Sequence, residues 1–145
     1  MEEKIILEVK HISKTFFSDK GDTDAIEDVS LNVRENEFLV LLGPGQAGKT
    51  TFLNIIAGLV KPTSGTIKLG GKPITGTDPR IAMVFQKTGL YEWKTALENT
   101  EIGLKYRNAP KSERRETAMK YLELVGLTGF ENAYPHALSG GMKQR

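Results

Sequence analysis

Apolar and polar positions in the first part of the chain predict two strands that pair with each other. Ile5, Leu7 and Val9 alternate with charged residues, which is the period of a strand with one buried face. A second strand-like stretch covers residues 25–33, and the intervening residues 18–22 are polar and contain a glycine. A connection of this length and composition favours a hairpin. We therefore expect an antiparallel pair at one edge of a sheet.

The next segment predicts a strand, a glycine-rich loop and a helix in that order. Residues 38–42 are all apolar, as expected for a strand that is buried on both faces. From Lys49 the apolar residues fall at helical spacing, and Gly58 and Pro62 mark where that helix is expected to stop. The sequence then predicts short strands at 66–69 and 81–85.

The rest of the chain has a helical character. One helix is expected at 95–105, and Ser112 is a candidate N-cap for another. Four apolar residues of that second helix are expected to share one face: Ala118, Met119, Leu122 and Val125. We therefore predict a single domain in two parts, a strand-rich part at 1–86 and a helical part at 87–145.

Composition sets limits on the class of protein. The chain has 145 residues, of which 39% are hydrophobic and 26% charged, so it is expected to form one soluble globular domain. Its net charge of +2 predicts no nucleic-acid partner. It has no cysteine, which suits a reducing compartment such as the cytoplasm. Its longest apolar run is much shorter than the roughly 20 residues that span a bilayer, so we expect membrane association only through a partner.

The glycine loop carries the clearest chemical signal. Its residues fit the pattern G-x-x-x-x-G-K-[ST] in the sequence Gly43-Pro44-Gly45-Gln46-Ala47-Gly48-Lys49-Thr50. The predicted strand before it and helix after it supply the context that this phosphate-binding loop requires. Backbone N–H groups and the helix N-terminus attract phosphate oxygens, and Lys49 adds a mobile positive charge for the β and γ phosphates. The sequence thus predicts a nucleoside triphosphate site that extends to Thr51, with Thr50 as a Mg²⁺ ligand.

A second motif near the end of the chain narrows the class of nucleotide-binding protein. Its residues Leu138-Ser139-Gly140-Gly141-Met142 follow the phosphate loop, a strand-like segment ending in Gln86 and a helical stretch. Together these features resemble the ATP-binding cassette (ABC) proteins, over essentially the whole chain. The resemblance implies an α/β P-loop NTPase fold with a RecA-like core, an antiparallel β edge and an inserted helical subdomain. By the same resemblance, Ser139 and the following N–H groups are expected to face the γ-phosphate held by a second subunit.

The resemblance also assigns roles to single residues. Gln86 is expected to contact Mg²⁺ or the attacking water and, with Lys49, to serve catalysis; an ordinary surface glutamine is the alternative. Phe16 is the expected adenine-stacking ring, with Phe17 as the runner-up and a hairpin core residue as the alternative. Ala25 is expected to line the same base or ribose.

The stretch after Gln86 points to transport. Residues Leu90-Tyr91-Glu92-Trp93 and the sequence ALENTEIGL resemble importer ATPases, particularly the nitrate, sulfonate and taurine group. This implies an ATP-hydrolysing homodimer on the cytoplasmic face of the membrane, with the region Gln86–Trp93 docked on permease subunits. Core packing is the alternative for Leu90, Tyr91 and Trp93. An ABC ATPase acting on DNA or ribosomes is a further alternative, which the small net charge disfavours.

Two departures from the family pattern matter. Gln46 stands where the family usually has glycine, and a residue with a side chain fits that backbone conformation poorly. The chain also ends at Arg145, before the Walker B strand with its glutamate and before the switch histidine. His11 and His136 lie in other contexts and are expected to be surface or packing residues. The 145 residues are therefore expected to form a nucleotide-binding module that lacks hydrolysis.

Overall fold

The computed structural model describes residues 4–145. The first three residues of the predicted N-terminal part lie outside the described residues. The chain divides into two compact units, with the boundary between Met83 and Val84; the sequence prediction placed its division after Gln86. Each unit is described separately below.

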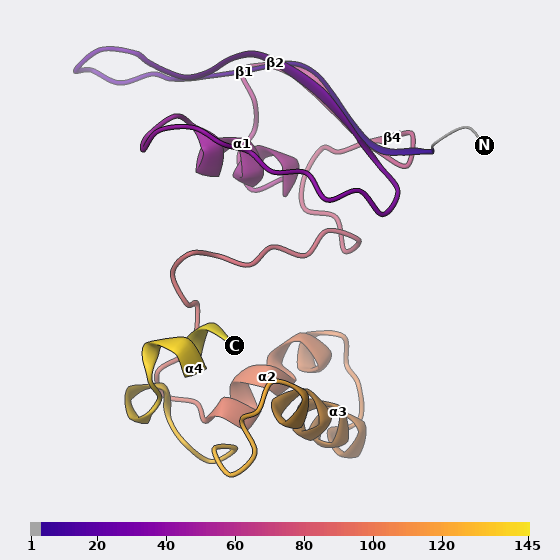
Figure 1. Cartoon of the computed structure of the whole chain (residues 1–145), viewed down its shortest axis with the longest axis vertical. Helices are drawn as coiled ribbons and strands as arrows, with labels where there is room; N and C mark the ends of the chain where they lie inside the picture. The colour runs from indigo at the N-terminus through magenta and orange to yellow at the C-terminus, as the bar shows by residue number, and fades with distance from the viewer. Residues whose placement is uncertain (1–3) are drawn as a thin grey trace. The chain divides into compact units, whose positions relative to one another are not determined.

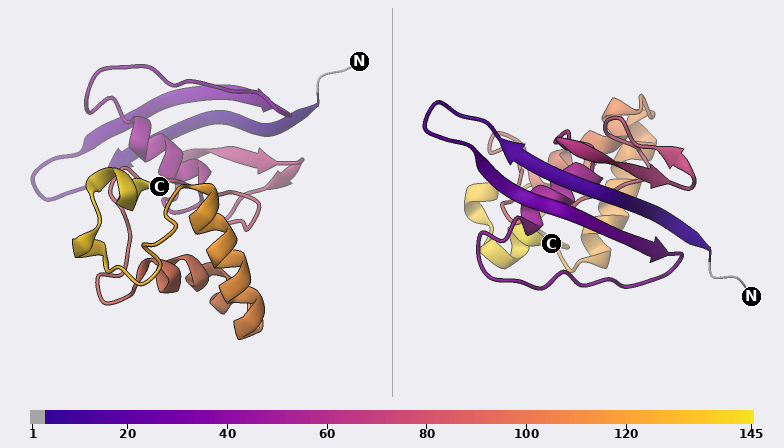
Figure 2. Two further views of the ribbon diagram at one scale, coloured as in Figure 1. Left: turned by 60° about the horizontal axis from the view of Figure 1, so that its bottom comes forward. Right: turned by 90° about the horizontal axis from the view of Figure 1, so that it is seen from above.

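The first unit is built on a four-stranded sheet in the order β2-β1-β3-β4 (Figures 1 and 2). Strands β1 (Ile5–Phe16) and β2 (Thr23–Arg34) form a long antiparallel hairpin. On its other side β1 pairs antiparallel with β3 (Ser64–Leu69), which pairs with the short β4 (Lys72–Pro73). The predicted hairpin and the predicted strand at 66–69 are confirmed. The sheet places β1 between two partners and leaves β2 and β4 at the edges.

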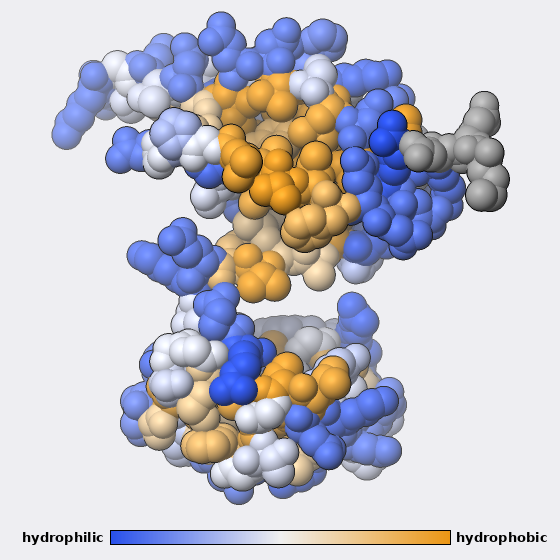
Figure 3. Space-filling view, viewed as in Figure 1, coloured by the Kyte–Doolittle hydropathy of each residue, from blue (hydrophilic) through white to orange (hydrophobic). Residues whose placement is uncertain are grey.

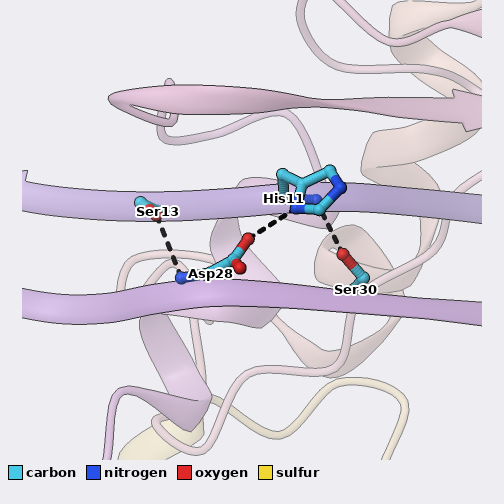
Figure 4. Close-up of polar contacts among 4 residues, drawn as sticks. All are labelled: His11, Ser13, Asp28 and Ser30. Atoms are coloured by element: carbon cyan, nitrogen blue, oxygen red, sulfur yellow. Dashed lines mark hydrogen bonds and ion pairs between the residues drawn. The ribbon is translucent and has the colours of Figure 1, made fainter.

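The hairpin contains two bulged positions that face each other (Figure 4). His11 has φ 51 and Asp28 has φ 46, so both lie in the left-handed region. The hydroxyl of Ser30 accepts the backbone N–H of His11, and the hydroxyl of Ser13 accepts that of Asp28. The two side chains are joined at 2.7 Å between His11 Nδ1 and Asp28 Oδ1. As predicted, His11 is a surface residue, and its exposed pair with Asp28 holds the irregular region together.

Helix α1 (Lys49–Ile56) contributes to the core of the sheet unit. Its Phe52 and Ile55 are buried together with Val9 and Ile12 of β1. The predicted start of this helix at Lys49 is confirmed. Its end lies near Gly58, where φ is 72 and a Cβ atom would lie 2.0 Å from the carbonyl oxygen of Gly76. Glycine is therefore needed where the chain turns away from the helix.

The predicted strand at 38–42 is wrong. The described structure assigns no secondary structure there, and the side chains of Phe38 and Leu42 are 92% and 89% exposed. A strand needs a neighbour for its N–H and C=O groups, and none of the described strands β1–β4 pairs with this segment. Leu41 alone of the run packs against the core. Figure 3 shows extensive hydrophobic surface on this unit.

The predicted strand at 81–85 is also wrong, for the same reason. The structure has no strand at these positions, and Val84 is 83% exposed. Among the described residues no strand pairs with this stretch. An apolar run predicts burial, but it forms a strand only where a partner supplies the hydrogen bonds.

The second unit consists of helices. It contains α2 (Ala96–Tyr106), α3 (Lys111–Leu124), the short 3₁₀ helix η1 (Pro135–Ala137) and α4 (Gly140–Gln144). Its buried core is formed by Ala96, Leu97, Ala118, Leu122, Leu127 and Leu138. Within the described part of the chain, none of these or other helices is both long and apolar enough to span a bilayer.

The face predicted for the second helix is largely confirmed. Ala118 and Leu122 of α3 are buried and Val125 packs against them, but Met119 is 40% exposed. The predicted cap, however, is wrong. The helix begins at Lys111 with Pro110 as its N-cap and has no side-chain cap, so Ser112 lies inside its first turn.

Helix α2 lies where a helix was predicted, and it begins with a side-chain cap. The Thr95 hydroxyl accepts the Glu98 N–H at 3.2 Å, and the Glu98 carboxylate accepts the Thr95 N–H at 2.9 Å. This reciprocal arrangement satisfies two N–H groups that the helix itself leaves free. The hydrogen bond from Thr95 lowers the pKa of the Glu98 carboxyl.

The two candidate caps predict a contrast in stability. Thr95→Ala is expected to lower the free energy of unfolding of the helical unit by about 1 kcal/mol, because it removes the cap of α2. Ser112→Ala is the matched control and is expected to change it by less than about 0.5 kcal/mol, as at an ordinary surface position. Chemical denaturation followed by circular dichroism measures both. An equal loss in the two variants would contradict the assignment of the caps.

Candidate nucleotide-binding site

The loop 43–48 turns sharply into helix α1. The N–H of Ala47 donates to the carbonyl of Pro44 at 3.3 Å, closing a tight turn. Gln46 has φ 65 and Gly48 has φ 75, so both lie in the left-handed region. The expectation that position 46 has a backbone that suits glycine is confirmed. Gln46 carries its side chain at this position at an energetic cost, because left-handed backbone disfavours residues with a Cβ atom.

Gly48 joins the loop to the sheet. It is the N-cap of α1, and a Cβ atom on it would lie 2.1 Å from the carbonyl oxygen of Ala25 on β2. Both its φ angle and this close approach require glycine. The contact fixes the start of the helix against the hairpin. It also brings Ala25 next to the phosphate loop, which the motif alone could not indicate.

Lys49 folds back over the loop. Its ammonium donates to the carbonyl of Gly43 at 2.7 Å and to that of Pro44 at 2.6 Å. An ammonium has three donors, so one remains for a ligand. The N-terminus of α1 has no side-chain cap and no acidic residue in its first turn. These features fit a polyphosphate, because the free N–H groups and the helix dipole both favour negative charge. Thr50 is exposed and Thr51 half-buried in the same turn.

The candidate base site lies at the end of the hairpin. Phe16 pairs with Thr23 next to the hairpin turn, and its side chain is 44% exposed, against 72% for Phe17. The Lys14 ammonium lies 4.9 Å from the centroid of the Phe16 ring, within the range of a cation–π contact. The sequence analysis did not identify Lys14, although its two-residue spacing from Phe16 on a strand places both on one face.

Gln86 and the residues after it belong to the second unit. Gln86 is exposed in a segment that has no regular secondary structure. Leu90 is half-buried, whereas Tyr91 and Trp93 are 37% and 73% exposed. The Tyr91 and Trp93 rings meet edge to face, with centroids 5.2 Å apart and planes at 65°. Trp93 is therefore a surface residue rather than part of a core. The joint role of Gln86 and Thr50 at Mg²⁺ stays a prediction.

The second motif is divided between core and surface. The Leu138 side chain is buried in the helical core and Met142 packs against it. Ser139, Gly140 and Gly141 are exposed. The Ser139 hydroxyl caps α4 by accepting the Met142 N–H at 3.3 Å. Leu138 and Met142 thus anchor the motif, and its exposed surface is formed by the residues between them. His136, predicted to be a surface or packing residue, stacks on Tyr134.

Comparison with known proteins decides the family. A family model described as ABC transporter matches residues 26–145. The chain belongs to the ABC transporter family. An uncharacterized ABC transporter ATP-binding protein of Methanocaldococcus jannaschii is 46% identical over 142 residues, which cover 98% of this chain and 53% of the relative. A nitrate import ATP-binding protein of Synechocystis is 42% identical over 139 residues, covering 96% of this chain and 52% of that protein.

Further relatives agree with the ABC assignment. A taurine import ATP-binding protein of Roseobacter denitrificans is 42% identical over 140 residues, which are 96% of this chain and 52% of that protein. A solved dimeric ATP-binding cassette in a post-hydrolysis state, bound to ADP and Pi, matches with a TM-score of 0.84 and 33% identity. That match covers 95% of this chain and 65% of the solved chain. The predicted ABC-type α/β fold is thus confirmed. The chain spans about half the length of the curated relatives it matches.

Substitution of two glycines of the loop is expected to affect stability to different degrees. Gly48→Ala is expected to lower the free energy of unfolding by about 1–3 kcal/mol, because the new methyl group would collide with the Ala25 carbonyl. Gly45→Ala is the matched control, since its Cβ would meet nothing within 4 Å. Urea denaturation of both variants measures the difference. If Gly48→Ala were no less stable than Gly45→Ala, the loop would not be held against the hairpin by this contact.

Replacement of Gln46 by glycine is expected to make the protein more stable. Gln46→Gly is expected to raise the free energy of unfolding by up to about 1 kcal/mol, because glycine removes the cost of the left-handed backbone. Thermal unfolding detects this change. Gln144→Gly, in the last turn of α4, is the control and is expected to lower stability as glycine does in a helix. A loss of stability on Gln46→Gly would mean that the Gln46 side chain makes a compensating interaction.

Proposed function

We propose that this chain is the nucleotide-binding part of the ATP-binding subunit of an ABC importer. It binds MgATP and, in the full-length protein, hydrolyses ATP to drive solute uptake. The observation that carries the proposal is the loop at the start of α1. There an uncapped helix N-terminus, the Lys49 ammonium and a left-handed turn come together, and this combination favours phosphate. Membership of the ABC transporter family supports ATP as the nucleotide.

The roles of the loop residues follow from their chemistry. The N–H groups of residues 43–51 hold the phosphate oxygens, and the remaining Lys49 proton neutralises the β and γ phosphates. Thr50 supplies an oxygen ligand for Mg²⁺, which shields the phosphate charge when bound. Catalysis in the full-length protein consists mainly of positioning and charge neutralisation, to which Lys49 and Gln86 contribute.

The adenine base is held at the end of the hairpin. Phe16 offers its ring for stacking, and Ala25, two residues after the pairing partner of Phe16, approaches Gly48 of the phosphate loop. The contact between Ala25 and Gly48 supports this assignment, because it joins the base site to the phosphate site within one unit. A stacked ring does not read the edges of the base, so these residues discriminate weakly between bases.

The second motif acts across a dimer. Ser139, Gly140 and Gly141 are exposed at the start of α4 and face the γ-phosphate bound by another copy of the subunit. The dimeric state of the solved cassette bound to ADP and Pi supports this arrangement. Because the Ser139 hydroxyl accepts the Met142 N–H, it keeps its own proton to donate to a phosphate oxygen. Leu138 and Met142 hold this surface in place from the core.

The transport role is proposed from the relatives and from the exposed aromatic residues. The names of the matched nitrate and taurine proteins describe import, and we extend that role to this chain. The segment Gln86–Trp93 docks on transmembrane permease subunits, with Tyr91 and Trp93 as its exposed apolar rings. The subunit is then cytoplasmic and bound to the inner face of the membrane through the permease.

A second function applies to residues 1–145 on their own, namely nucleotide binding without turnover. Both histidines of the chain are engaged with other groups, His11 with Asp28 and His136 with Tyr134. Neither lies in the phosphate loop at residues 43–51, so we propose neither as a catalytic acid or base. We expect this chain to release no more phosphate from MgATP than its Lys49→Ala variant does.

The phosphate site is tested by titration calorimetry with MgATP. Lys49→Ala is expected to weaken binding roughly ten- to hundredfold, the range that corresponds to a lost hydrogen bond to a charged group. Lys61→Ala removes an exposed lysine beyond the end of α1 and is expected to bind MgATP like the parent chain. Equal affinities in all three proteins would refute the phosphate site.

The importer role is tested separately, by capture of transmembrane subunits with the full-length protein.

A further inference from the structure

The exposed aromatic pair, Tyr91 and Trp93, lies on a short turn that precedes α2 in the sequence. The N–H of Lys94 donates to the carbonyl of Tyr91 at 3.0 Å, which closes the turn 91–94. Tyr91 and Trp93 project from it and meet edge to face. A turn of this kind is exposed and, with one backbone hydrogen bond, would be mobile on its own.

One side chain of α2 binds this turn at several points. The Asn99 Oδ1 atom accepts the Tyr91 N–H at 2.8 Å, and the Asn99 Nδ2 group donates back to the Tyr91 carbonyl at 3.2 Å. The Asn99 amide thus pairs with both polar groups of the Tyr91 backbone, as a neighbouring strand would. Nδ2 also lies 3.0 Å from the carbonyl of Lys94 and 3.0 Å from that of Thr95. A single half-buried amide therefore holds the turn where it starts and where it ends.

The helix gives no local reason for asparagine at this position. Asn99 lies in the first turns of α2, just after the capping box of Thr95 and Glu98. Asparagine lowers helix stability relative to alanine or leucine, because its amide competes for backbone groups. Here the Asn99 amide bonds to Tyr91 and Lys94, which precede the helix, and to the carbonyl of the N-cap Thr95.

We propose that Asn99 is a positioning residue that holds Tyr91 and Trp93 in a fixed, exposed arrangement for docking on the permease. This inference rests on the proposed function, because it assumes that the aromatic pair is the docking surface. A partner that meets preordered rings does not have to pay the entropy of ordering them on binding. Asn99 itself does not touch the partner, and it acts through the geometry of the turn.

The first test measures the order of the turn in the 145-residue chain by backbone NMR relaxation. In the parent chain, residues 91–94 are expected to have order parameters near about 0.85, and Asn99→Ala is expected to lower them below about 0.6. Trp93 is the sole tryptophan of the chain, so its signal is identified directly. Thr100→Val is the matched control. It removes a bond to the Ala96 carbonyl inside α2 and leaves the turn untouched.

A second variant covers the case in which Asn99→Ala disturbs the helix. Asn99→Asp keeps the shape of the side chain but replaces its donor by an acceptor that faces the carbonyls of Tyr91, Lys94 and Thr95. It is expected to release the turn as Asn99→Ala does. Amide shifts of residues 96–106 show in each variant whether α2 remains intact. If the order of residues 91–94 were unchanged in both variants, the proposal would be overturned.

The second test separates positioning from a purely structural role. Full-length protein with Asn99→Ala is expected to bind the permease subunits captured by the parent about tenfold more weakly, since two side chains must be ordered on docking. Its affinity for MgATP is expected to equal that of the parent. A released turn with unchanged permease affinity would place the docking surface elsewhere and overturn the proposal. If the parent captures no permease, the importer role fails, whereas the order parameters still report whether Asn99 holds the turn.

Discussion

The close approach of Gly48 to the Ala25 carbonyl is the contact on which the arrangement of the site depends. It sets the start of α1 against β2, with no room for a methyl group between them. Three segments lie within a few residues of this contact along the chain. They are the end of the hairpin, where Phe16 pairs with Thr23, the turn that contains Gln46, and the first turn of the helix with Lys49. Backbone packing therefore fixes the loop that we propose binds phosphate against the strand that carries Ala25. The side chains of these segments act from positions that the backbone packing sets.

The charge of Lys49 is held in a comparable way. Two carbonyl groups of its own loop accept its protons, so the ammonium does not extend freely into solvent. A charge that is already oriented loses less entropy when it meets an anion. The same principle recurs in the helical unit, where the Asn99 amide orders the turn that carries Tyr91 and Trp93. In both places a polar side chain satisfies main-chain groups of a loop and thereby orders the part of the loop that we propose meets a ligand or partner.

Much of the fold could be predicted because local patterns determine it. Alternation and a polar turn indicated the hairpin, and helical spacing indicated α1. The phosphate loop could be located because its motif combines with that order of elements. Burial was harder to predict. The apolar runs at 38–42 and 81–85 were expected to be strands, but a strand also requires a partner, and none of the described strands provides one.

Other features could not be predicted because they depend on residues that are distant in sequence. The facing bulges at His11 and Asp28 depend on hydroxyl groups of the opposite strand, Ser30 and Ser13. The contact of Gly48 with Ala25 depends on how the helix approaches the sheet. Ser112 was a reasonable cap by residue type, but Pro110 suits the start of α3 because it lacks an N–H group that would need a partner.

The position of β1 between β2 and β3 has a consequence for folding and binding together. Residues 35–63 leave the sheet after β2 and return at β3, so the whole phosphate loop and α1 lie within a closed segment whose two ends are tied through β1. Closing such a segment costs chain entropy. A ligand that binds only the closed form must therefore stabilise the β1–β3 pairing by mass action. If the chain binds nucleotide as we propose, amide hydrogen exchange in β3, which lies outside the phosphate loop, would slow when the site is occupied.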